Sequence, residues 1–422
     1  MCKSSRRILF VILTAALLLR IGLVIAQPVT AQSLDRLPDQ REYLSLAQNL
    51  LQHGSLSFFD PRFGQTVYAY RMPGYPILLA ACGASVSLAR VEQCLIDVSS
   101  VLAIFLITRQ LLFVRKHIPV TSVEGRRAEA AALIAAALVA LDPFYIYFAN
   151  LLLSETLFAA LVVWGIYFLL RHTMPPFLVG VAFLIAAAYV KTTGLLMFPA
   201  VVFVFILNFM APAAYRLSDL RRVCLICVPF FLMLFLAMIP WTWRNHQLLD
   251  SWIWTTTNSG VTLYDSFHPG VTGASDQRFI TALPGVMSMN EVQRSRFLAA
   301  SARNWAFSNW TQIPKLSAMK ILRGWSPIPL SRDFGKPVYR IISAAYSIPF
   351  DLLCLVGLFS PRLTRRAKLL IGTPALVVTM GMVMSVGSIR YRMPAEAPLA
   401  VLASVGVIEL FDRRKFEERN LE

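Results

Sequence analysis

Apolar runs, most of them close to the length of a membrane-spanning helix, alternate with short polar stretches along this chain. A transmembrane helix needs about 20 mostly apolar residues with few charges. The pattern predicts an all-α polytopic membrane protein with about ten transmembrane helices. Their predicted ranges are 8–27, 94–114, 129–149, 152–170, 175–190, 193–210, 223–241, 339–359, 368–387 and 394–411.

The polar stretches between these runs carry basic clusters, which predict the orientation. Cytoplasmic loops of membrane proteins are enriched in Lys and Arg. All of the clusters fall on one side of the predicted membrane, so a multi-pass protein of the inner (plasma) membrane with both termini cytoplasmic is predicted. The clusters comprise Lys3, Arg6, Arg7, Arg115, Lys116, Arg126, Arg127, Arg171, Arg216, Arg221, Arg222, Arg362, Arg365, Arg366, Lys368, Arg413, Arg414 and Lys415.

Two long segments then lie outside and divide the chain into three parts. Residues 1–241 form an N-terminal transmembrane module that contains the first outer loop, 28–93. Residues 242–338 form a large outer (periplasmic) segment, and residues 339–422 form the last transmembrane helices with a short cytoplasmic tail.

Juxtamembrane helices are predicted in both outer segments. In 38–54, a proline early and a glycine just past the end are typical helix boundaries. One face of that helix is apolar, so it is expected to lie along the membrane surface; the face consists of Tyr43, Leu46, Ala47, Leu50 and Leu51. Residues 291–325 carry Trp305, Trp310 and Trp325 among basic residues, a composition that also suits an interfacial helix.

Two segments leave alternatives open. Residues 76–90 are apolar but short, and counting them as a crossing would put the basic clusters out of phase, so we expect them to stay in the interface. The basic N-terminus and its apolar run could also be a signal peptide with small residues Ala26 and Ala31 near a cleavage site. An uncleaved first span is preferred, and either choice leaves the following segment outside.

Composition narrows the possible classes of function. Hydrophobic residues make up 57% of the 422 residues and mean hydropathy is +0.60, which supports the membrane prediction. The net charge of +17 would suit a nucleic-acid-binding protein, but no basic stripe or aromatic-rich basic motif accompanies it. Cys224 and Cys227 form a C-x-x-C inside an apolar run, where packing is favoured over redox or metal chemistry. The five histidines are isolated, and no pair of them has the spacing of metal ligands.

Several ionisable residues stand where membrane insertion disfavours them. Asp39 opens the first outer helix and Glu155 lies at the outer end of the fourth run, where either acid could simply complement a helix dipole. Lys191 interrupts an uncharged stretch at the outer turn of a hairpin, where a snorkelling lysine is the alternative to a ligand site. Arg390 and Arg392 share a very short outer loop, which the topology rule disfavours for paired arginines.

Arg71 and Arg244 also lie where outer loops meet the bilayer. Together with the residues above, they suggest one site at the outer membrane surface with two carboxylates and several cations. Arginine forks suit phosphate oxygens, and lysine adds a compact positive charge. A base together with cations around a departing phosphate is what transfer from a lipid-phosphate donor requires.

A series of short motifs in order along the chain resembles the membrane-embedded (GT-C) glycosyltransferases. The similarity is to the bacterial group related to protein O-mannosyltransferases (glycosyltransferase family 39) and lipid A aminoarabinose transferases. The motifs are DQREYLSLAQNLLQHG, RMPGYPILLA, LDPFYIYFANLLLSETLF, YVKTTGLLMFP, IPWTWRN and RYRMPAEAPLAVLA. The resemblance implies transfer of a sugar from a polyprenyl-phosphate donor to a glycan, lipid or protein acceptor, with inversion and without a cofactor.

The resemblance also implies roles for individual residues. Asp39 matches the family's catalytic acid, which deprotonates the acceptor, and Glu155 matches a second acidic position. Gln40 follows Asp39 where many relatives carry a second acid, which argues against a metal-binding version. The remaining matches are expected to bind substrate: Arg71, Tyr75, Lys191, Arg244, Arg390 and Arg392.

Three other functions compete with this interpretation. A transporter or flippase of a lipid-linked substrate would also bury ionisable groups, but transporters favour charges at the bilayer midplane and inverted repeats. Here the unusual charges lie at the outer edge of the predicted membrane and no repeat is evident. An assembly protein without chemistry and a polysaccharide ligase with a polyprenyl-diphosphate donor are the other two.

Overall fold

The computed structural model describes residues 3–30, 34, 37–114, 119, 121–171, 173–207, 220–330 and 336–421. Helix accounts for 77% of it and strand for 2%, so the predicted all-α class is confirmed. The basic residues Arg115, Lys116 and Arg216, and the possible cleavage-site residue Ala31, lie outside the described residues.

Helices and one small hairpin follow one another in the first half of the chain. The helices are α1 (Lys3–Ala26), α3 (Pro38–His53), α4 (Gly74–Ala81), α5 (Val86–Arg109) with its π-helical end η1 (Gln110–Val114), α6 (Val123–Leu141), α7 (Pro143–Phe148), α8 (Glu155–Leu169), α9 (Met174–Val190) and α10 (Gly194–Phe205). The hairpin pairs β1 (Phe58–Asp60) with β2 (Gln65–Val67) in antiparallel fashion.

The second half contains helices and no strand in the part that the structure describes. Its elements are α11 (Leu220–Leu249), α12 (Asn258–Ser266), α13 (Phe279–Ala282), η4 (Val286–Ser288), α14 (Glu291–Ser308), η5 (Trp310–Gln312), α15 (Ile313–Gly324), α16 (Pro337–Phe359), α17 (Arg365–Met384), η7 (Ile389–Arg392) and α18 (Met393–Leu421).

Within the described residues, 6 helices are long and apolar enough to cross a membrane, which indicates a membrane protein. They are Lys3–Ala26, Val86–Phe113, Cys227–Leu249, Pro337–Phe359, Arg365–Met384 and Ile389–Arg414. Three other predicted spans coincide with the shorter apolar helices α8, α9 and α10. The predicted span 129–149 is broken at Asp142, which ends α6 and caps α7. The full count of ten spans therefore stays a prediction.

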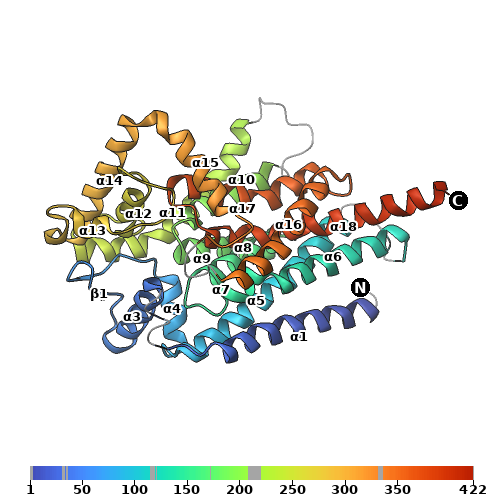
Figure 1. The fold of residues 1–422 in the computed structure, drawn as a ribbon, viewed down its shortest axis with the longest axis horizontal. Coiled ribbons are helices and arrows are strands. Elements are labelled where there is room, and N and C mark those ends of the chain that lie inside the picture. Colours follow the sequence, from blue (N-terminus) through green and yellow to red (C-terminus); the bar gives the residue numbers. More distant parts are fainter. Residues whose placement is uncertain are drawn as a thin grey trace.

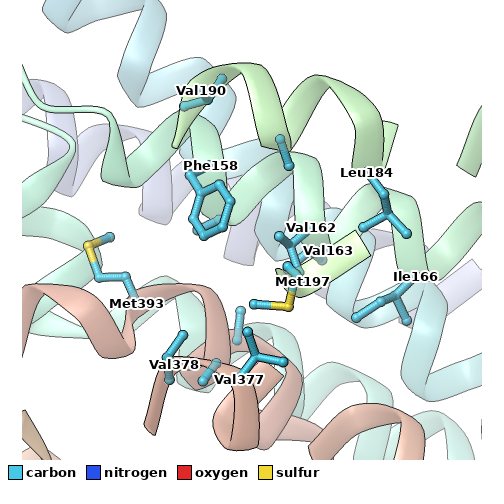
Figure 2. Close-up of a cluster of buried hydrophobic side chains, with 14 of the residues drawn as sticks. Phe158, Val162, Val163, Ile166, Leu184, Val190, Met197, Val377, Val378 and Met393 are labelled. Atoms are coloured by element: carbon cyan, nitrogen blue, oxygen red, sulfur yellow. The ribbon is translucent and has the colours of Figure 1, made fainter. Parts of the chain in front are cut away.

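The core of the bundle is formed where α8 packs against α5, α9 and α18. Figure 2 shows part of it, with Phe158, Val162 and Ile166 of α8 facing Leu184 of α9 and Met197 of α10. Glycines allow two of the helices to approach very closely. A Cβ on Gly357 of α16 would lie 1.9 Å from the Leu402 carbonyl oxygen of α18, and one on Gly406 would lie 2.2 Å from that of Leu353. Small residues at helix contacts are characteristic of membrane bundles.

A buried ion pair attaches α1 to the bundle. The Arg20 guanidinium pairs with Asp97 of α5, and Arg20 is fully buried. The same guanidinium donates to the Ala140 carbonyl oxygen of α6 at 2.9 Å and to that of Ala16 at 3.0 Å. A buried charge is stable only when it is paired and its remaining donors are satisfied, and here carbonyls satisfy them.

The predicted outer segments gather at one end of the molecule, opposite the two termini. In Figure 1, α3, β1, α12, α13 and α14 lie at the left, whereas the N and C ends both lie at the right. Ion pairs at the terminal end join Arg127 to Asp412 at 2.6 Å and Arg362 to Glu124 at 2.8 Å. Three of the stretches predicted to be cytoplasmic are therefore in contact with one another.

The predicted helix at 38–54 is present as α3, with Gly54 in the left-handed conformation at its end (φ 64). The structure packs its apolar face against α4, so protein rather than lipid covers that face. Tyr43, Leu46 and Ala47 are buried, whereas Leu51, near the end of the helix, is 53% exposed.

The apolar stretch 76–90 is divided between two helices. It comprises the end of α4 and the first turn of α5, whose cap Ser85 accepts a hydrogen bond from the Leu88 amide at 3.4 Å. With 8 residues, α4 spans only about 12 Å and is too short to cross a bilayer.

The tryptophan-rich segment 291–325 forms α14, η5 and α15 rather than one helix. Trp310 is 70% exposed, whereas the Trp325 indole donates to Thr379 Oγ1 of α17 at 2.9 Å. The three tryptophans therefore do not form one interfacial row, because Trp325 is bound to the bundle.

Candidate functional site

Five of the sequence-predicted residues meet in one continuous network of ion pairs. Arg71 Nη2 lies 2.5 Å from Asp39 Oδ1, and Arg390 Nη2 lies 2.7 Å from Asp39 Oδ2. Arg390 Nε also lies 3.1 Å from Glu155 Oε1, and Lys191 Nζ lies 2.8 Å from the same oxygen. We call Asp39, Arg71, Glu155, Lys191 and Arg390 the charged cluster.

Each member of the charged cluster is placed by a different element. Asp39 is in the first turn of α3 and Glu155 in the first turn of α8, where acids complement the helix dipole. Arg71 precedes α4, and Arg390 is in η7. Lys191 follows α9 at the turn into α10, a turn that needs Gly194 because a Cβ there would lie 2.5 Å from backbone atoms of Ala187 and Ala188.

A second layer of charges supports the cluster from the side of the hairpin. Arg71 Nε donates to Glu42 Oε2 at 2.7 Å, and Arg62 pairs with Glu42 and lies 2.7 Å from Asp60 Oδ2. Sequence reasoning missed Glu42, Arg62 and Asp60, because charges in a polar outer loop are ordinary. The available signal was the spacing of Glu42, which is three residues after Asp39 and therefore on the same helix face.

The charged cluster borders a cavity of about 350 Å³. Four cluster residues line it: Arg71, Glu155, Lys191 and Arg390. Phe158, Val190 and Val378 add an apolar surface that continues into the core cluster of Figure 2. A further side comes from α12 and the residues before it, and we call it the α12 wall; it consists of Thr256, Asn258, Ser259, Thr262 and Leu263. Ligand sites commonly combine such apolar surface with a few convergent polar groups.

The two carboxyl groups on α3 respond differently to their surroundings. Burial alone would raise the pKa of Asp39, but the positive charges of Arg71 and Arg390 outweigh it and hold the pKa of Asp39 well below its usual value. Burial raises the pKa of Glu42 despite the nearby Arg71 and Arg62 charges. Asp39 is therefore a charged but weak base while both arginines hold it. An anion that drew the arginines away would strengthen it as a base.

Tyrosine rings cover the cationic side of the cluster. The Arg71 guanidinium carbon lies 5.3 Å from the ring centre of Tyr43 and 5.5 Å from that of Tyr70. Lys191 Nζ lies 4.8 Å from the ring centre of Tyr391. Burial raises the pKa of Tyr43 to about 12, so its hydroxyl stays protonated. Aromatic faces attract these cations without neutralising them.

Three sequence-predicted residues lie outside the charged cluster. Arg244 donates to the carbonyl oxygens of Tyr68 and Leu56, each at 2.7 Å, and holds the outer segments together. Arg392 pairs with Glu396 at 2.8 Å and donates to the Ser326 carbonyl oxygen at 2.9 Å, away from the cavity lining. Tyr75 is fully buried and donates to Gln93 Oε1 at 2.6 Å. Each of these side chains is occupied by protein.

One buried acid ties the two outer segments together beside the site. Glu291, in the first turn of α14, accepts from the Tyr68 amide and from Thr257 Oγ1, both at 2.9 Å. The Thr257 amide in turn donates to the Ala69 carbonyl oxygen at 2.9 Å. The segment that carries Arg71 and the segment that opens the α12 wall are therefore fixed to each other.

Among the described residues, no group of three or more His, Cys, Asp or Glu side chains is arranged to hold a metal ion. No protein-family model matches the chain, and a search of curated proteins found no match to it.

Proposed function

We propose that the chain is a membrane glycosyltransferase that moves a sugar from a polyprenyl-phosphate donor to an acceptor on the outer face of the inner membrane. The observation that carries the proposal is the charged cluster at the edge of the 350 Å³ cavity. Three cations and one carboxylate of the cluster line that cavity, so the charged groups that an entering ligand would meet are mostly cationic.

The proposed topology has about ten membrane crossings with both termini cytoplasmic. The separation in Figure 1 between the two termini and the outer elements α3, α12 and α14 supports it. In this arrangement the charged cluster faces the outside, at the level where the donor's headgroup would lie. The donor's long apolar tail would lie along the helices of the bundle, as lipid does.

The donor phosphate would bind the cationic side of the cavity. Guanidinium groups bind phosphate oxygens in pairs of hydrogen bonds, which favours Arg71 and Arg390 as its ligands, and Lys191 adds a compact charge. A phosphate there would compete with Asp39 for both arginines. Its binding would release the carboxylate and allow the pKa of Asp39 to rise toward its usual range.

The reaction proposed is a single displacement. The acceptor hydroxyl oxygen forms a bond to the anomeric carbon while the bond from that carbon to the phosphate oxygen breaks. Asp39 takes the hydroxyl proton, and the electron pair of the broken bond leaves with polyprenyl phosphate, whose charge the cluster cations stabilise. Attack from the face opposite the leaving group inverts the configuration. Glu155 keeps Lys191 and Arg390 in place through its shared oxygen.

The test is incubation of the purified protein in lipid nanodiscs with a panel of polyprenyl-phosphate sugars and a cell-envelope extract that supplies acceptors. The readout is free polyprenyl phosphate. Asp39→Asn is expected to lower its release at least about 100-fold, since general-base catalysis contributes factors of that order. Asp276→Asn is the matched control, because Asp276 lies on the exposed outer surface beside Arg278.

Release that depends on Asp39 would support the transferase and identify its donor. Full release by Asp39→Asn would contradict the role of Asp39 as the base. No release from any donor by folded protein would overturn the proposal. The polyprenyl-diphosphate ligase would then be the favoured function, followed by the transporter.

A further inference from the structure

The α12 wall differs from the rest of the cavity lining because it carries no charge. Its polar members are hydroxyl and amide side chains, namely Thr256, Asn258, Ser259 and Thr262. The charged residues of the lining, by contrast, come from the segment before α4, from α8, from the α9–α10 turn and from η7. The cavity therefore has one region suited to an anion and another suited to neutral hydroxyl groups.

Two polar groups on the cavity lining have no hydrogen-bond partner among the residues that the structure describes. The Asn258 side-chain oxygen and the Tyr70 hydroxyl are both buried without a hydrogen bond, and Tyr70 is only 3% exposed. Neighbouring hydroxyls are occupied, since Thr257 Oγ1 donates to Glu291 and Ser259 Oγ donates to the Thr256 carbonyl oxygen at 2.7 Å. Buried polar groups are almost always satisfied, so such groups beside a cavity indicate a ligand.

The two unpartnered groups are carried by backbone segments that are hydrogen-bonded to each other. The Thr257 amide donates to the Ala69 carbonyl oxygen at 2.9 Å, and Asn258 and Tyr70 each follow directly in sequence. Glu291 locks this junction by binding both Tyr68 and Thr257. The backbone on both sides of this part of the cavity is therefore fixed before a ligand binds, which lowers the entropy lost on binding.

We propose that Asn258 and Tyr70 form a subsite for the hydroxyl groups of an uncharged donor sugar. This inference rests on the proposed function and specifies its substrate class. An amide oxygen accepts from a sugar hydroxyl, and a phenol hydroxyl donates to one. Burial raises the pKa of Tyr70 above its usual value, so the phenol keeps the proton it donates.

The charges of the lining exclude the two charged classes of sugar. Glu155 is the one carboxylate on the cavity lining within the described residues, and Lys191 and Arg390 already bind it. The ammonium group of an amino sugar would thus meet three cations and no available acid. The carboxylate of an acidic sugar would compete with the donor's own phosphate for the same cations.

The experiment measures lipid binding to the protein in nanodiscs with three probes: bare polyprenyl phosphate, polyprenyl-phosphate hexose and polyprenyl-phosphate amino sugar. The quantity compared is the ratio of the affinity for each sugar-bearing lipid to that for the bare lipid. The variants are Asn258→Ala and Tyr70→Phe. Asn309→Ala, at the end of α14, is the matched control because the Asn309 side chain donates to the Trp305 carbonyl oxygen, away from the cavity lining.

We expect the wild type to bind the hexosyl lipid more tightly than the bare lipid. Each subsite variant should lower that ratio by roughly fivefold, the worth of one neutral hydrogen bond, without changing affinity for the bare lipid. Tyr70→Phe removes an unpartnered hydroxyl, so it should not lower the thermal unfolding midpoint.

Two results would overturn this inference while the proposed function stands. One is an unchanged ratio in both variants, and the other is tighter binding of the amino-sugar lipid than of the hexosyl lipid. Failure of the wild type to bind bare polyprenyl phosphate is a different result. It would count against the proposed function itself and would remove the subsite with it.

Discussion

Arg390 donates a hydrogen bond to Asp39 at 2.7 Å, although 351 positions separate the two residues in the sequence. Arg71 binds the other oxygen of the same carboxylate at 2.5 Å. Both oxygens of Asp39 are thus occupied by guanidinium groups from distant segments. This arrangement makes the position of Arg390 depend on the fold of the whole chain, and it allows the roles of individual arginines to be separated by experiment.

Substitution of the two arginines of η7 should have different effects. Arg390→Gln removes a cation from the cavity lining, and the affinity for polyprenyl phosphate should fall roughly 10- to 100-fold, the worth of a charge-assisted hydrogen bond. Arg392→Gln leaves Glu396 buried without its cation, so the free energy of unfolding should fall by about 3–5 kcal/mol. Lipid-binding assays in nanodiscs and thermal unfolding measure the two effects. Equal loss of lipid affinity in both variants would contradict the conclusion that Arg392 stabilises the fold and does not bind the lipid.

Removal of Arg71 should destabilise the fold through Glu42. Arg71→Gln leaves two carboxylates with fewer cations, and the free energy of unfolding should fall by about 3–5 kcal/mol. A second substitution, Glu42→Gln, removes one of these charges and should recover a large part of the stability. It should not recover transfer activity, because the guanidinium is still absent. A double variant no more stable than Arg71→Gln would show that the Glu42 charge is not the cause.

The sequence was informative where a charge interrupts an apolar run. Glu155 and Lys191 could be recognised because insertion disfavours them, and over the described residues the predicted spans coincide with helix apart from the break at Asp142. The break at Asp142 was missed, although the Asp-Pro pair at 142–143 is a typical helix start, and the Asp142 side chain accepts from the Phe144 amide at 2.8 Å.

Arginines in outer loops could not be sorted by sequence. Arg244 and Arg390 stand in similar places at the ends of apolar runs, yet Arg244 binds carbonyl oxygens and Arg390 lines the cavity. A guanidinium has five donors that suit a carbonyl as well as a phosphate, so only the folded structure shows which acceptor lies within reach. Glu42 and Arg62 were overlooked because they lie in a polar segment, where a charged residue does not stand out from its neighbours.

Lys320 should make the free energy of unfolding depend on pH in the alkaline range. It is fully buried on α15, its Nζ lies 3.0 Å from the Val383 carbonyl oxygen, and burial lowers its pKa to about 8. The unfolded chain keeps this proton up to about pH 10.4, so between pH 8 and 10 the unfolded state binds more protons and stability rises with pH. The gain should reach at most about 3 kcal/mol.

The comparison for this prediction is Lys320→Met, which has no group to titrate at that position. Thermal unfolding of both proteins is followed from pH 7 to pH 10, and the wild type should gain on the variant across that range. Because the other groups that titrate between pH 7 and pH 10 are the same in both proteins, their effect cancels in the difference between the two stabilities. Parallel curves would mean that Lys320 keeps its ordinary pKa in the folded protein.

Gly260 fixes the distance between α12 and α14. A Cβ at this position would lie 2.0 Å from the Ser295 carbonyl oxygen, so Gly260→Ala must push the α12 wall away from α14. The free energy of unfolding should fall by about 1–3 kcal/mol. Gly372→Ala in α17 is the matched control, because nothing lies within 4 Å of its added Cβ, and helix propensity should make it neutral or slightly stabilising. The measurement is the thermal unfolding midpoint of both variants. Similar midpoints would contradict the close approach of α12 to α14.

The contact between Asp39 and Arg390 also bears on how the protein is made. A ribosome delivers the chain from the N-terminus, so Asp39 and Arg71 are synthesised long before Arg390. Until η7 emerges, the Asp39 carboxylate has only one of its two arginine partners and the cavity lacks one of its cations. A product of premature termination before this point would carry most of the apolar helices, yet it would be unable to complete the charged cluster. Completion of the chain itself thus determines when the site comes into existence.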